Sequence, residues 1–70
     1  MTRDERNEAR ERGCELALQA HEASDAATVT VGSSRDWRVV AVAAQRARDA
    51  WEALQLWAWS AADEERRDGR

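Results

Sequence analysis

The sequence predicts an all-α fold, an antiparallel helical hairpin that pairs with a second copy to form a four-helix bundle. One observation is composition: the chain is rich in Ala, Arg and Glu and has no Pro, a combination that favours helix. The other is a line of apolar residues whose spacing alternates between three and four, which keeps one side of a long helix facing a partner helix. The line consists of Trp37, Val40, Ala44, Ala47, Trp51, Leu54, Ala58 and Ala61.

The chain is short for a self-sufficient fold. Its 70 residues form a single domain, 1–70, and domains of this size usually need a disulfide, a metal or an oligomer for stability. Cys14 is the one cysteine, so no disulfide forms within the chain. Oligomerisation is therefore the expected source of stability, and the single cysteine favours a reducing, cytoplasmic location.

The first helix is predicted over residues 3–23. Thr2 and Glu5 have the spacing of a capping box, in which the Thr hydroxyl accepts from a first-turn N–H group. The apolar positions of this helix are few, and its first turns are nearly all charged. Gly13 costs about 1 kcal/mol relative to Ala in a helix interior, so this helix is predicted to be the weaker of the two. The apolar line is Ala9, Gly13, Leu16, Ala20 and Ala23.

Residues 24–34 are predicted to connect the helices. Within them, Thr28–Val31 is β-branched throughout and alternates polar with apolar side chains, as a strand does. Two interpretations follow: a loop whose valines cover the end of the bundle, or a short strand that pairs with its own copy. The loop is favoured, because a single four-residue strand is marginal.

The second helix is predicted over residues 35–67. Ser33, Ser34, Arg35 and Asp36 repeat the cap-and-acid pattern of the first helix start. No Pro or Gly occurs between residues 35 and 67. The arginines near residue 67 suit the negative end of a helix dipole.

Matching levels from the connection outward sets Leu16 opposite Val42 and Ala9 opposite Asp49. The Trp-rich end of the long helix then faces the charged start of the first helix. Each indole carries roughly 150–250 Å² of surface to bury, which favours cover from a second chain. A further apolar line lies away from the first and strengthens this expectation: Val39, Val42, Ala53 and Leu56.

The function predicted from this pattern is a small non-catalytic protein–protein interaction module that self-associates. Trp and Arg are the commonest energetic anchors of interfaces, so a second, heterologous protein partner is also expected. All eleven basic residues are Arg; this bias is typical of GC-rich coding and favours a bacterial or phage source. The interaction module is expected to act as a regulator or inhibitor of a host protein. The expected interface residues are Trp37, Val40, Ala44, Ala47, Trp51, Leu54, Trp57, Ala58 and Trp59.

Two alternatives remain open from the sequence: a DNA-associated regulator and a structural assembly subunit. The first would use a basic cluster at the start of the long helix. Against it stand the net charge of −3, the acids interspersed with the arginines, and the lack of a DNA-binding signature. The cluster is Arg35, Arg38, Arg46 and Arg48.

Catalytic and metal chemistry find little support. Cys14 and His21 lie seven residues apart, a poor match to the close spacing of zinc ligands. We expect no cofactor, and no enzyme, because so small a hairpin should lack a pocket of the usual size. The uncharged stretch 53–62 is too short to span a bilayer, and the N-terminus lacks the apolar core of a signal peptide.

Overall fold

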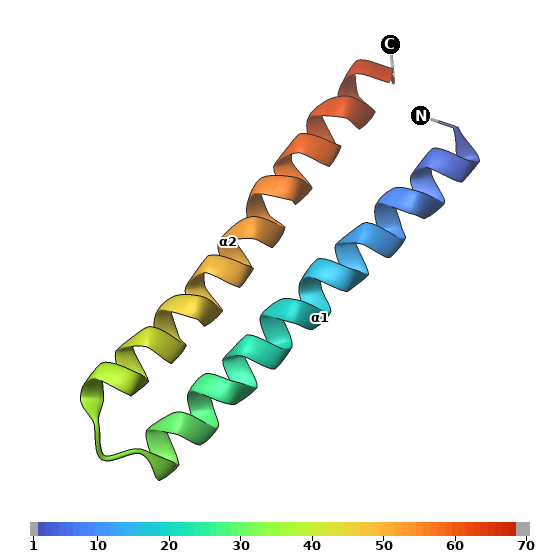
Figure 1. Ribbon diagram of the computed structural model, residues 1–70. Helices are drawn as coiled ribbons and strands as arrows, with labels where there is room; N and C mark the ends of the chain where they lie inside the picture. Colours follow the sequence, from blue (N-terminus) through green and yellow to red (C-terminus); the bar gives the residue numbers. More distant parts are fainter. Residues whose placement is uncertain (1, 69–70) are drawn as a thin grey trace.

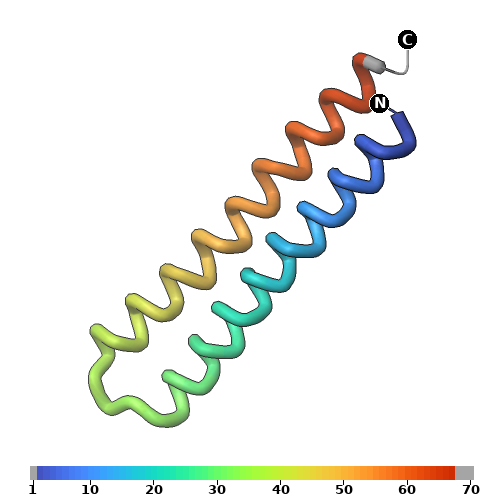
Figure 2. The backbone as a smooth tube through the Cα atoms, turned by 45° about the vertical axis from the view of Figure 1, so that its right-hand side comes forward, coloured from blue at the N-terminus to red at the C-terminus, as the bar shows by residue number. Residues whose placement is uncertain are grey.

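Residues 2–68 are described by the computed structural model, and they form two helices joined by a short turn. Helix α1 spans Arg3–Ser33 and helix α2 spans Trp37–Asp68. The helices run antiparallel, side by side along their length (Figure 1), and the two chain ends lie at the same end of the hairpin (Figure 2). The Cα trace measures 54 × 16 × 10 Å. The predicted all-α hairpin is confirmed.

The predicted cap of α1 is confirmed at Thr2. Its hydroxyl oxygen accepts from the backbone N–H of Glu5 at 3.2 Å, and its carbonyl accepts from the N–H of Arg6 at 3.0 Å. The Glu5 carboxylate accepts from the Thr2 hydroxyl, also at 3.2 Å. Asp4 and Glu5 give the first turn the negative charge that suits the positive end of the helix.

The predicted connection over residues 24–34 is wrong, because residues 24–33 continue α1. Neither the loop nor the strand forms at Thr28–Val31. The hydroxyls of Thr28, Thr30 and Ser33 each donate to the carbonyl four residues earlier, at 3.0, 2.7 and 2.7 Å. These bonds satisfy the side chains within the helix, and the helix-propensity cost of β-branched residues is only a few tenths of a kcal/mol.

The turn is shorter and later than predicted, and Asp36 rather than Ser33 or Ser34 caps α2. The Asp36 carboxylate accepts from the N–H of Arg38 at 2.9 Å, and its carbonyl accepts from the N–H of Val40 at 3.3 Å. Ser34 supports the turn, since its hydroxyl oxygen accepts from the N–H of Asp36 at 3.2 Å. The predicted start of the second helix at residue 35 is therefore two residues early.

The register expected from the sequence is also wrong. Because α1 continues to Ser33, its middle lies opposite the middle of α2, and its first half lies opposite the second half of α2. Gly13 lies against Trp57, and Ser24 lies against Trp51. The Trp-rich part of α2 therefore meets the middle of α1, as well as its charged start.

The contact between the helices is narrow and consists mainly of small side chains. Leu16, Ala20 and Ala47 are the buried residues among those described. The α1 apolar line is confirmed, and it continues past the predicted helix end through Ala27 and Thr30, which are half-buried. On α2 the half-buried and buried positions that face α1 are Val40, Ala43, Ala47, Ala50, Leu54, Trp57 and Ala61.

Candidate interaction surfaces

Only half of the apolar line predicted on α2 faces α1. Val40, Ala47, Leu54 and Ala61 lie on the shared side of the hairpin, whereas the alternate members of the line are exposed. These four residues belong to two lines with heptad spacing. One is the predicted line, and the other is the inward line, which runs through Ala43, Ala50 and Trp57 instead of the exposed members. The apolar surface of α2 is thus wider than one partner helix covers. The exposed members are Trp37, Ala44, Trp51 and Ala58.

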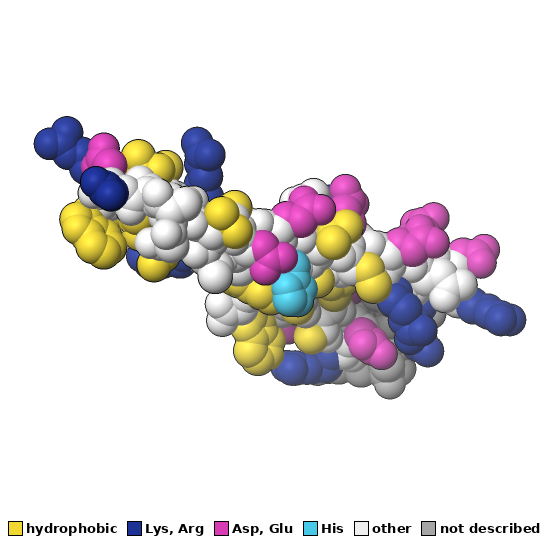
Figure 3. Space-filling view, turned by 90° about the horizontal axis from the view of Figure 1, so that it is seen from below, with side chains coloured by type: hydrophobic (Ala, Val, Ile, Leu, Met, Phe, Trp, Pro, Cys, Tyr) yellow, Lys and Arg dark blue, Asp and Glu magenta, His cyan; other side chains and the backbone are white. Residues whose placement is uncertain are grey.

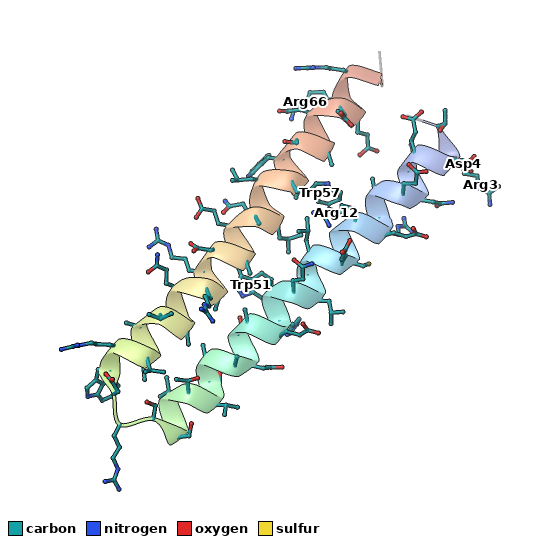
Figure 4. The ribbon with its side chains drawn as sticks, viewed as in Figure 1. Arg3, Asp4, Arg12, Trp51, Trp57 and Arg66 are labelled. Carbon is teal, nitrogen blue, oxygen red and sulfur yellow. The ribbon has the colours of Figure 1, made fainter. Side chains whose placement is uncertain are left out.

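Trp57 packs at Gly13 of α1. A Cβ atom built at Gly13 would lie 2.8 Å from Cζ3 and 3.0 Å from Cη2 of the Trp57 ring. The indole therefore occupies the space that any side chain at position 13 would take. Figure 4 shows Trp57 pointing from α2 toward α1. The sequence signal for this contact was a glycine on the inward line of α1, but its partner could be found only with the correct register.

Trp51 bridges the two helices through a polar contact. Its indole N–H donates to the Ser24 hydroxyl at 2.7 Å. The His21 ring meets it edge to face, with centroids 5.8 Å apart and planes at 63°. Although its side chain remains 42% exposed, its polar atom is satisfied within the chain. The role of His21, left open by the sequence, is this packing against Trp51.

The other two indoles point away from the hairpin contact. Trp37 begins α2 and is 75% exposed, and Trp59 is 62% exposed. Leu56 is 61% exposed on the same helix. Single exposed apolar residues are ordinary, whereas α2 leaves several large ones exposed along its length. Figure 3 shows apolar side chains opening to solvent between charged ones.

An open groove runs between the helices near the turn, and we call it the turn-end groove. Its volume is about 750 Å³. We expected no pocket of the usual size on so small a hairpin. The groove has the volume of an ordinary ligand pocket, but it is an open surface groove and not an enclosed pocket. Its lining combines small and β-branched side chains with charged ones. The lining residues are Gln19, Glu22, Ala23, Ala26, Thr30, Arg38, Val39, Val42, Ala43 and Arg46.

The arginines predicted as a nucleic-acid surface occupy three different places. Arg38 and Arg46 line the turn-end groove. Arg48 lines a smaller hollow of about 370 Å³ with Trp51, Glu52 and Gln55. Arg35 lies exposed in the turn.

Metal and membrane features are sparse in the described part of the chain. Over residues 2–68, no three His, Cys, Asp or Glu side chains gather where they could hold a metal ion. Cys14 is a free, exposed thiol. Neither α1 nor α2, within the described residues, is long and apolar enough to cross a membrane.

Comparisons with known proteins give no further guide to function. The chain matches no family model, and neither a curated protein nor a solved structure is similar enough to count as a match.

Proposed function

We propose that this protein is a non-catalytic protein–protein interaction module that self-associates, with two hairpins forming a four-helix bundle. The observation that supports the proposal most strongly is the apolar surface that the hairpin leaves open on α2. Val39, Val42, Leu56 and Trp59 are each about half exposed or more. Burial of apolar surface is worth roughly 25 cal/mol per Å², so a second chain on this helix has a clear source of free energy.

The small core supports the same proposal. Three residues are buried among those described, and two of them are alanines. A chain of 70 residues with so little buried surface gains its stability most simply from association. Small side chains along α2 also permit close approach of another helix.

A heterologous partner is the second part of the proposal. Trp37 and Trp59 are candidate anchors for such a partner, because large indoles contribute strongly when an interface desolvates them. On this account the protein acts by binding, as a bacterial or phage regulator or inhibitor does.

Light scattering across concentration tests the self-association. From micromolar to millimolar protein, the mass should rise from one chain to two, and the indole emission should shift to shorter wavelength as the rings are covered. A mass of one chain throughout, with unchanged emission, would contradict the proposal. Circular dichroism at each concentration provides the control that the helices stay formed.

A further inference from the structure

One flank of α2, beside its contact with α1, carries apolar and charged residues in an order that matches the same flank of a second, antiparallel α2. One line on this side, which we call the groove line, repeats the three-and-four spacing of a helix face. Two valines, which line the turn-end groove, come first; Arg46 and Asp49 follow; Ala53 and the exposed Leu56 come last. The groove line consists of Val39, Val42, Arg46, Asp49, Ala53 and Leu56.

We infer that a second copy of this chain docks on the groove line with its α2 antiparallel, about a two-fold axis near residues 47 and 48. This inference rests on the proposed self-association and adds its geometry. In this register Val39 lies opposite Leu56 of the second copy, and Val42 lies opposite its Ala53. Each Leu56 thereby enters the turn-end groove of the other copy.

Charge complementarity selects the antiparallel direction. Arg46 of each copy lies opposite Asp49 of the other, so the two-fold axis generates two reciprocal ion pairs. In a parallel pair, Arg46 would face Arg46 and Asp49 would face Asp49, and like charges in contact oppose docking. Arg46 and Asp49 are both exposed. Between two described residues the structure forms one ion pair, Arg12–Glu15 at 2.9 Å, so these two charges are available to a second copy.

A two-fold arrangement also closes the assembly. The hollow of the groove and the projecting Leu56 lie on the same side of α2, fourteen residues or about 21 Å apart from Val42 to Leu56 at 1.5 Å per residue. Each copy therefore offers both halves of the contact, and the same surface is used twice.

Charge-reversal variants test this docking in solution. Arg46→Asp creates a face with two acids, and Asp49→Arg creates a face with two bases. Each variant alone should dimerise at least about tenfold more weakly than the original chain, because both reciprocal pairs become repulsive. An equimolar mixture of the two variants should recover a dimer close to the original affinity, since every pair becomes attractive again.

The matched control places the same charge changes elsewhere on α2. Arg48→Asp and Glu52→Arg lie beside Trp51 in the smaller hollow. These variants should dimerise as the original chain does, with no preference for the mixture. If the control pair behaves like the Arg46 and Asp49 pair, general charge attraction explains the result and the inference is overturned.

Disulfide trapping separates antiparallel from parallel docking. In chains carrying Cys14→Ser, Val39→Cys and Leu56→Cys should cross-link in a mixture and not with themselves. In the antiparallel register two copies of residue 39 lie about 25 Å apart, at 1.5 Å per residue, far beyond disulfide reach. Self-linked Val39→Cys would show parallel docking and overturn the inference.

The mass of the original chain distinguishes the two levels of the account. A dimer that is insensitive to both Arg46→Asp and Asp49→Arg overturns this docking and leaves the proposed self-association standing. A monomer at millimolar concentration overturns both. Circular dichroism of every variant checks that the exposed substitutions leave the helices formed.

Discussion

At the residue scale, Gly13 is the position that lets the two helices approach around an indole. Its missing side chain leaves the space that the six-membered ring of Trp57 occupies. A glycine inside a helix costs about 1 kcal/mol relative to alanine. The glycine gives up this helix propensity, and its missing side chain lets Trp57, the largest side chain in the helix contact, pack against α1.

Gly13→Ala should therefore destabilise the hairpin, although alanine is the better helix former. The new methyl would lie 2.8 Å from the ring, so the indole must shift from its place against α1. Gly32→Ala is the matched control, because nothing lies within 4 Å of a Cβ there, and it should stabilise the protein by about 0.5–1 kcal/mol. Thermal and urea unfolding measure both variants.

Repeating Gly13→Ala in a chain that also carries Trp57→Leu tests whether contact with the indole causes the destabilisation. With Trp57→Leu the ring is gone, so Gly13→Ala should become as stabilising as Gly32→Ala. If Gly13→Ala raises the free energy of unfolding while Trp57 is present, the proposed role of the glycine fails.

The sequence could identify these residues but not their partners. Gly13 and Trp57 each lie on an apolar line that the spacing predicts. The contact between them, like that of Trp51 with His21 and Ser24, depends on the register of the helices. Helix α1 is ten residues longer than predicted, so each residue of α1 lies opposite a different residue of α2 from the one expected.

At the element scale, the turn is set by Asp36 and by the continuation of α1. The segment Thr28–Val31 has the sequence pattern of a strand, but the three-and-four spacing of the inward positions continues through Ala23, Ala27 and Thr30. Packing against α2 outweighs β-propensity, which is a weak and context-dependent preference. The helical spacing was the better signal, and it was readable from the sequence.

Substitutions at the turn test which residue caps α2. Asp36→Ala should cost about 1 kcal/mol of stability, because it removes the acceptor for the Arg38 N–H. Ser33→Ala should change stability by less than about 0.5 kcal/mol, since its hydroxyl bonds back within α1. The opposite ranking in chemical unfolding would restore the cap and the long connection predicted from the sequence.

At the scale of the whole molecule, one hairpin does not use all the apolar surface of its longer helix. The sequence predicted this excess correctly, because apolar residues occupy several sides of α2. It misplaced the excess, since Val40, Ala47, Leu54 and Trp57 pack against α1 within the same chain. Val39, Val42 and Leu56 stay exposed along one side of α2, and Trp37 and Trp59 stay exposed on another.

The most direct measurement is an isotope-filtered NOE experiment on an equimolar mixture of labelled and unlabelled protein at millimolar concentration. It detects only contacts between different copies of the chain. We predict intermolecular cross-peaks between the methyl groups of Val39 and Leu56. A well-ordered spectrum with no intermolecular cross-peaks would contradict the claim that a second copy covers α2.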